Sequence, residues 1–258
     1  MGDMVPGTYE DAFTVRCMEV TRHGAARVET LFDYFQEVAC VHADRLGCGC
    51  AELAKSGQAW VLLRIRMDVA RNPQLGERVS VKTWPSGFKR LYALREGVFT
   101  DETGAEIAQL TSYWVLLDTA HLRPLRLPDA LNVALPDNSD MPQYFDLSAR
   151  LMPTGLEHPM TLTVPEHFID INGHVNNARY CSLVGDWLAK VAGGPVELTT
   201  MTAHFMQATQ AWSDITVSGR LEADGHFAVA ISDDGEAPVM RFAAEGICHK
   251  SPGDTNRG

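Results

Sequence analysis

The chain has 258 residues, of which 45% are hydrophobic, enough for a substantial core in one large domain or two ordinary ones. Its formal net charge is -11 at pH 7, which disfavours nucleic-acid binding through many phosphate contacts. The N-terminus shows no basic run followed by an apolar stretch, and no apolar run approaches the roughly 18 residues of a membrane span. We therefore expect a cytoplasmic protein with neither nucleic-acid nor membrane partners.

Six cysteines occur, and the sequence predicts that they are reduced and mostly buried. Cys48 and Cys50 lack the two-residue spacer of common zinc and redox motifs, so we expect neither a metal nor a cofactor. Cys181 has two interpretations. It could be a nucleophile, because it lies near a predicted helix start, where the pKa of a thiol falls, but packing is the favoured one.

The first half predicts a strand, a long helix and four more strands. Alternation favours a strand over 13–19, and period-3.6 hydrophobicity favours a helix over 26–46. Residues 48–57 are predicted as a loop. Turn sequences separate the four strand candidates, which cover 60–70, 78–84, 91–100 and 107–118.

Residues 121–155 are rich in proline and predict a linker with little regular structure. It would join an N-terminal domain over 1–120 to a C-terminal domain over 156–258.

The second half repeats the order of the first. A strand over 161–164 precedes a polar turn and a helix that ends at Gly193; four strand candidates follow at 198–207, 215–221, 227–232 and 239–249. Glu19, Thr21 and His23 have the same spacing as three polar residues 151 positions later, Asp170, Asn172 and His174. The sequence thus predicts a duplicated α+β unit, in which a helix lies against one face of a mainly antiparallel sheet.

The turn that starts at Asp170 carries the strongest chemical signal. It reads Asp170-Ile-Asn172-Gly-His174-Val-Asn176-Asn177, and either of the last two residues is a good N-cap for the helix. Free N–H groups at a helix start favour negative charge, and a carboxylate with an imidazole can serve hydrolysis at a carbonyl. Asn, Asp and Gly also gather before helices for capping alone, so no single residue of the turn is decisive.

The stretch from Asn172 to Tyr180 resembles the Asn-x-His-x-Asn-Asn-x-x-Tyr segment of acyl-acyl-carrier-protein thioesterases of the plant and bacterial type. Trp60-Val-Leu, Thr83-Trp-Pro and Tyr113-Trp-Val-Leu-Leu-Asp118 resemble other segments of that family. The resemblance covers nearly the whole chain. It implies two tandem hotdog domains, each a long helix against a curved antiparallel sheet, with the acyl pocket in the first and the catalytic residues in the second.

The resemblance also implies an activity in fatty acid biosynthesis: hydrolysis of the thioester between a fatty acyl chain and acyl carrier protein. It places catalytic roles on Asp170, Asn172 and His174, with His174 or Asp170 as general base. The family's glutamate on the strand after the second helix is missing, and Gln207 or Gln210 could stand in its place.

Four further residues are predicted to bind substrate, Asn176, Asn177, Phe35 and Trp60; the two aromatic ones could equally be plain core. His42 is more simply an interior histidine with its hydrogen bonds satisfied. The first-half turn, Glu19 to His23, is expected to be a non-catalytic relic.

An acidic enzyme needs a local positive surface to dock acyl carrier protein, which is itself acidic. The candidate is a cluster of Arg64, Arg66, Lys89, Arg90 and Arg95, with scattered solvated charges as the alternative. Three other functions stay open: acyl-coenzyme A thioesterase, non-catalytic acyl-thioester binding and, more weakly, a hotdog dehydratase. A homodimer is also open.

Overall fold

The computed structural model describes residues 7–127, 129–131, 133, 135–235 and 238–251. Its strands form one sheet, and every pair of neighbouring strands among the described residues is antiparallel. The strands are β1 (Tyr9–Thr14), β2 (Gln58–Val69), β3 (Arg78–Lys89), β4 (Tyr92–Thr100), β5 (Glu106–Asp118), β6 (Arg123–Pro124), β7 (Glu157–Thr163), β8 (Val196–Phe205), β9 (Asp214–Leu221), β10 (His226–Asp233) and β11 (Met240–Lys250).

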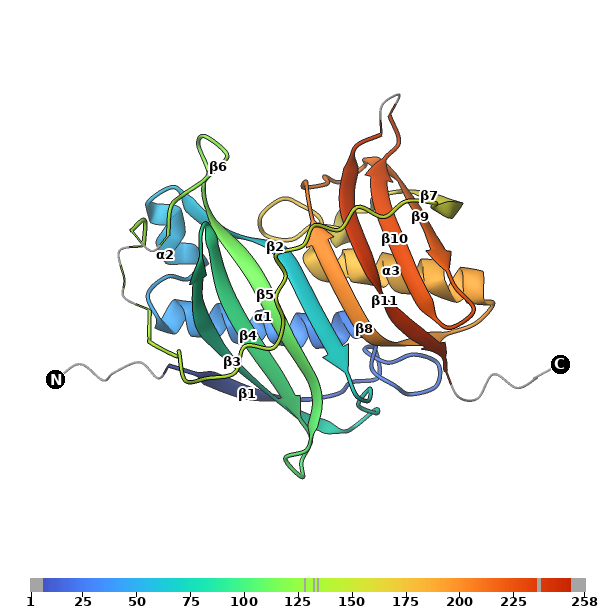
Figure 1. Cartoon of the computed structure of the whole chain (residues 1–258), viewed down its shortest axis with the longest axis horizontal. Helices are drawn as coiled ribbons and strands as arrows, with labels where there is room; N and C mark the ends of the chain where they lie inside the picture. Colours follow the sequence, from blue (N-terminus) through green and yellow to red (C-terminus); the bar gives the residue numbers. More distant parts are fainter. Residues whose placement is uncertain (1–6, 128, 132, 134, 236–237, 252–258) are drawn as a thin grey trace.

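Two long helices, α1 (Val28–Arg45) and α3 (Asn177–Ala192), lie behind the sheet in Figure 1. Their apolar stripes are buried against it, as period-3.6 hydrophobicity predicts. The predicted bounds of both helices are confirmed within two residues. Gly193 ends α3 in the left-handed conformation, with φ 74°. No helix among the described residues is long and apolar enough to span a bilayer.

The sheet is built from two like sets of five strands. Its order is β1-β3-β4-β5-β2 followed by β8-β11-β10-β9-β7, so the second set repeats the first in reverse across the β2–β8 pair. That pair runs from Arg64 opposite His204 to Asp68 opposite Thr200, with Arg66 and Thr202 at its centre. The predicted α+β class is confirmed, and the two halves pair edge to edge through β2 and β8.

Three predictions about single elements are wrong. The first strand is Tyr9–Thr14 rather than 13–19, because its partner β3 ends its pairing at Thr14 opposite Arg78. The predicted loop 48–57 contains a short helix, α2 (Cys50–Lys55), held by the burial of Leu53 in a small apolar cluster beside β5. The thiols are not mostly buried, since Cys17, Cys40 and Cys50 are exposed.

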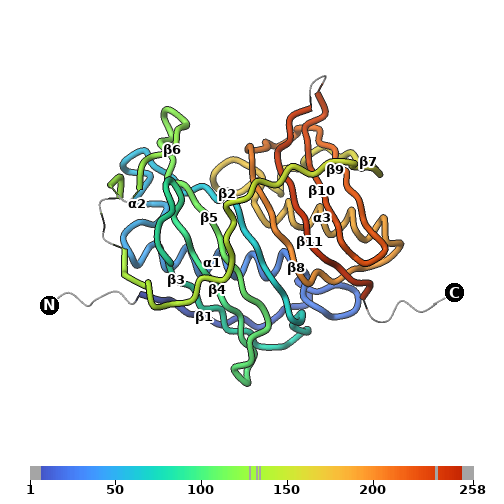
Figure 2. The backbone as a smooth tube through the Cα atoms, viewed as in Figure 1, coloured from blue at the N-terminus to red at the C-terminus, as the bar shows by residue number. Residues whose placement is uncertain are grey.

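A crossing segment (residues 138–155) runs over the sheet face opposite the two helices (Figures 1 and 2). It starts at Asn138, which donates to the carbonyl of Pro85 in β3, and reaches Thr154, whose carbonyl accepts from Arg220 in β9. It has no regular secondary structure but is anchored from one half to the other. The proline-rich linker is therefore a cover for the outer face.

Candidate active site

The turn before α3 is a tight backbone frame. Asp170 N–H donates to the carbonyl of His174 at 2.9 Å, and Gly173 N–H donates to the carbonyl of Asp170 at 3.0 Å. Gly173 has φ 76°, which a glycine adopts without steric cost. An isolated antiparallel bridge between Ile169 and Val175 closes the frame. The spacing of the polar residues is thus dictated by the turn.

Inside this frame, Asp170 and Asn172 are joined and His174 stands apart. The Asp170 carboxylate accepts from the backbone N–H of Asn172 at 2.8 Å and from its side-chain amide at 3.4 Å. The His174 side chain is exposed and makes no hydrogen bond to any described residue. The carboxylate therefore orients Asn172, not the imidazole, and the imidazole is free to meet a water or a ligand.

The start of α3 is capped from within the motif. The Asn176 side chain accepts from Ala178 N–H at 2.8 Å, and its carbonyl accepts from Arg179 N–H at 2.9 Å. Asn176 is thus the N-cap, as predicted. The N–H of Asn177, the first helical residue, has no intrahelical partner and remains a donor beside the turn.

The other wall of the site comes from the first half of the chain. Asn177 donates its side-chain amide to Gln36 on α1 at 3.2 Å, and Arg179 pairs with Asp33 at 3.3 Å. Asp33 and Gln36 lie on one face of α1, which also includes positions 37 and 40. Because these two residues contact the start of α3, this face of α1 lies toward the turn. The motif lies between the halves, where α1 closes it from one side.

Gln207 makes its hydrogen bonds to Arg241 and none to Asp170, Asn172 or His174 among the described residues. Its side-chain oxygen accepts from Arg241 at 2.8 Å, and its backbone N–H bonds the carbonyl of the same residue. The loop residue that touches the motif is Thr209, whose carbonyl accepts from Val175 and whose hydroxyl accepts from Tyr180 at 2.9 Å. Sequence reasoning missed Thr209, and only its backbone contact would have revealed it.

The predicted aromatic residues occupy different surroundings. Phe35 is fully buried on the inner side of α1, where its ring leaves no room for a side chain at Gly97. Trp60 is half-buried and donates its indole N–H to the carbonyl of Cys48 at 3.0 Å.

Cys181 is fully buried, and burial raises the pKa of its thiol, which favours packing over nucleophilic chemistry.

The first-half turn repeats the backbone frame, but not in the register that the side-chain spacing indicates. Val20 bridges Ala26 as Ile169 bridges Val175, and Thr21 N–H donates to the carbonyl of Ala25 as Asp170 donates to His174. The structural counterparts of Asp170, Asn172 and His174 are therefore Thr21, His23 and Ala25. The match that places Glu19 opposite Asp170 is wrong by two residues.

A cavity of about 540 Å³ lies at this first-half turn. It is lined by the turn, by the start of α1 at Glu29, by Ser182, Asp186 and Lys190 of α3, and by the residues around the start of β8. Only residues 193–195 join α3 to β8, whereas α2 lies between α1 and β2. The second half therefore has no helix equivalent to α2 among the described residues, and none lies beside the cavity at the first-half turn.

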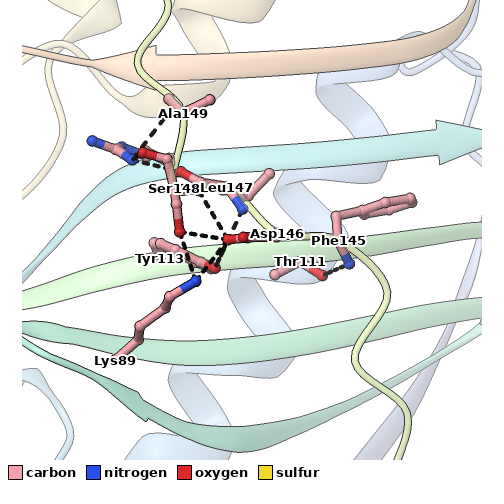
Figure 3. A network of polar contacts seen from close by, with 9 residues as sticks. Lys89, Thr111, Tyr113, Phe145, Asp146, Leu147, Ser148 and Ala149 are labelled. Carbon is pink, nitrogen blue, oxygen red and sulfur yellow. Dashed lines mark hydrogen bonds and ion pairs between the residues drawn. The ribbon is translucent and has the colours of Figure 1, made fainter.

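The predicted basic cluster does not form one free surface. Lys89 pairs with Asp146 at 2.9 Å and Arg64 donates to the carbonyls of Leu147 and Ser148, so both hold the crossing segment (Figure 3). Arg66 pairs with Asp68 in its own strand.

Arg95, another member of the cluster, points into the first half. It contacts the interior His42 at 3.2 Å and Thr83 at 3.3 Å, and burial lowers its pKa to about 10. Arg95 is therefore not part of a surface patch, and docking of acyl carrier protein on the other members of the cluster stays a prediction.

The fold and the site together define an α+β protein that is built from two like halves and has a polar turn at the start of its second long helix. Family models for the N-terminal and C-terminal domains of acyl-ACP thioesterases (ACP, acyl carrier protein) match residues 6–134 and 158–237. The chain therefore belongs to the acyl-ACP thioesterase family.

Curated relatives and solved structures agree with this assignment. The chain is 28% identical to a chloroplastic palmitoyl-ACP thioesterase of Gossypium hirsutum and to an oleoyl-ACP thioesterase of Arabidopsis thaliana, matching 76% and 79% of its own length. The matches span only 51% and 61% of those two relatives.

Two solved structures share the fold. An acyl-ACP thioesterase from Bacteroides thetaiotaomicron is 22% identical, with a TM-score of 0.84 over 94% of this chain and 98% of that one. The 12:0-ACP thioesterase from Umbellularia californica is 19% identical, with a TM-score of 0.78 over 96% and 100%.

Proposed function

We propose that this chain hydrolyses the thioester of a fatty acyl chain carried by acyl carrier protein, releasing the free acid. Family membership supports the reaction class. The observation that carries the proposal is the turn before α3, where a carboxylate-held Asn172, an unbonded His174 and the N–H of Asn177 gather at one helix start. These are the parts that water attack on a carbonyl needs.

The proposed mechanism assigns one role to each side chain. His174 takes a proton from water, whose oxygen forms a bond to the acyl carbonyl carbon. Asn172, oriented by Asp170, and the N–H of Asn177 donate to the oxyanion. The intermediate then breaks its carbon–sulfur bond, and the pantetheine sulfur leaves with the proton. Gln207 is given no role, because its side-chain oxygen accepts from Arg241.

We further propose that each half is a hotdog unit, over 1–120 and 156–258, with residues 121–155 as the connection. Equivalent strand orders and one long helix per half support this. Phe35 and Trp60 remain candidates for acyl contact at the first unit, although the full burial of Phe35 favours a core role.

A thiol-release assay tests the proposal. Wild-type protein is offered one acyl chain on acyl carrier protein and on coenzyme A, and His174→Ala is assayed beside it. We expect faster release from the carrier protein and a loss of about 10²–10⁴-fold in the variant. His167→Ala is the matched control, because His167 is also exposed, in the single 3-10 turn Glu166–Phe168 just before the motif, and should keep full activity.

Each alternative function has its own outcome in this assay. Faster release from coenzyme A would replace the proposed carrier. Tight acyl-thioester binding without any thiol release would make the chain a binding protein, and wild-type turnover in His174→Ala would remove the proposed base.

A further inference from the structure

One side chain of the first half contacts the turn before α3, and the proposed mechanism gives it no role. Gln36 lies in the middle of α1 and is half-buried. Its side-chain oxygen accepts from the side-chain amide of Asn177, the first residue of α3, at 3.2 Å. The two residues are 141 positions apart in the sequence, so the contact exists only because the two halves pack together.

The duplication of the chain provides a comparison for this contact. α1 begins at Val28 as α3 begins at Asn177, and both starts follow the same backbone frame. Counted from these starts, Gly185 of α3 is the counterpart of Gln36 of α1. The contact between Gln36 and Asn177 therefore corresponds to the pair of Gly185 and Val28, whose side chains have no hydrogen-bonding group.

The space beside this counterpart pair is open. Val28 and Gly185 both line the cavity of about 540 Å³ at the first-half turn. A Cβ added at Gly185 would meet no atom within 4 Å. The place that Gln36 fills beside the second turn is thus left empty beside the first, so the packing of the two long helices does not by itself require a side chain there.

The bond to Gln36 fixes an amide that has other acceptable partners close by. Asn side chains readily accept from backbone N–H groups near them. The N–H groups in the first turn of a helix are unsatisfied donors, and that of Asn177 is one of them. With the bond in place, the Asn177 side chain is held toward α1. Without it, the Asn177 amide oxygen would compete with a ligand for the N–H groups at the start of α3.

We propose that Gln36 is a positioning residue for thioester hydrolysis, a role that rests on the proposed function of the turn. Gln36 acts through Asn177. By accepting from the Asn177 side chain, it keeps the start of α3 open to the oxyanion that forms when water attacks the acyl carbonyl. The site in the second half of the chain thus depends on a side chain of the first half.

Two substitutions at position 36 test this role. Gln36→Met keeps the length of the side chain but removes the acceptor, whereas Gln36→Glu keeps an acceptor at the end of a side chain of the same length. With acyl-ACP as substrate, we expect Gln36→Met to lower kcat about tenfold, less than the roughly 10²–10³-fold cost of losing a whole oxyanion donor. KM should change by less than about twofold, because a contact that serves only the transition state acts on kcat. Gln36→Glu should keep at least about half of the wild-type kcat, since a carboxylate is the stronger acceptor.

A double variant shows whether Gln36 acts through Asn177. In Asn177→Ala no side-chain amide is left to be held, so adding Gln36→Met to it should change kcat by less than about twofold. Gly185→Ala is the matched control, because it alters the counterpart position on α3, has room for a methyl group and should leave kcat unchanged. Thermal unfolding of every variant checks that each is folded at the assay temperature.

The outcomes separate this role from the proposed function. Wild-type kcat in Gln36→Met would overturn the positioning role while the proposed function stands. The same conclusion would follow if Gln36→Glu were as slow as Gln36→Met, or if Gln36→Met had its full effect in the Asn177→Ala background. No thiol release by the wild-type protein would overturn the proposed function, and the role of Gln36 with it.

Discussion

The two turns that precede α1 and α3 have one backbone and two sets of side chains. In both, the same hydrogen bonds close the turn, with Gly24 and Gly173 at φ 86° and 76°. Both turns also contain the same hydrogen bond from a backbone N–H to a side chain. The Thr21 hydroxyl accepts from the N–H of His23, and the Asp170 carboxylate accepts from the N–H of Asn172. The backbone that the two turns share therefore cannot by itself give either turn a catalytic role.

What differs is the group at each position of the frame. The first turn has Ala25 where the second has His174, so it lacks any proton acceptor at the place of the proposed base. Burial raises the pKa of Glu29 and Asp186 beside the first turn, so these carboxyl groups resist ionisation there. The comparison teaches that the two copies of a duplicated turn can keep one backbone geometry while their side chains differ.

The largest expected effect comes from paired variants at one frame position. Asn172→Ala should lower the rate of acyl-ACP hydrolysis by about 10²–10³-fold, the usual cost of one oxyanion donor. His23→Ala, at the counterpart position, should leave the rate unchanged. Steady-state kinetics of both variants would show this, and equal losses in the two would mean that the frame matters more than its side chains.

The two halves also differ in the strands that join them, β2 and β8. His204 in β8 occupies the position equivalent to that of Asp68 in β2. His204 accepts from Leu151 N–H of the crossing segment, and burial, then Arg64 and Arg150, lowers its pKa to about 4. An unfolded histidine binds a proton below about pH 6.5, while the folded one resists until about pH 4. Stability should therefore fall between these pH values as pH decreases, by at most about 3 kcal/mol.

Urea unfolding at several pH values checks this slope. His204→Asn can keep an acceptor for Leu151 but cannot titrate, so its stability should change less over the same interval. A wild-type slope as shallow as that of the variant would show that His204 does not titrate as its burial requires.

Asp170→Asn keeps the size and turn propensity of the side chain but removes its charge. The amide holds Asn172 less firmly, because hydrogen bonds to a charged acceptor are the stronger ones. We expect normal folding and a loss of at least about tenfold in kcat/KM, equal to about 1.4 kcal/mol. Thr21→Val, the counterpart, should not change kcat/KM. Full activity in Asp170→Asn would leave Asn172 oriented by the turn alone.

The smallest effect concerns the helix caps. Asn176 accepts from Ala178 N–H, whereas Arg27, at the same place before α1, makes no side-chain cap. Asn176→Ala should lower the free energy of unfolding by about 1 kcal/mol, and Arg27→Ala by less. Chemical denaturation of both variants measures the difference. A larger loss for Arg27→Ala would mean that its bond to the carbonyl of Met18 outweighs a cap.

The sequence predicted the elements whose signal is local. Both long helices follow from apolar side chains at period 3.6, and Gly193 and Asn176 mark the ends of α3. The polar turn was found because its residues are contiguous. The helix α2 was missed, since only six residues form it and burial of Leu53 decides its conformation.

The repeated order of strand, helix and four strands in the sequence by itself determined that the chain is duplicated, and the contiguous polar residues determined that 170–177 is the candidate site. Only the tertiary structure decided the true register of the duplication, because backbone bridges, not residue types, align Thr21 with Asp170. It also decided that Lys89 and Arg64 hold the crossing segment and that α1 completes the site through Gln36. These contacts join residues far apart in the chain, and periodicity along a sequence carries no record of such distances.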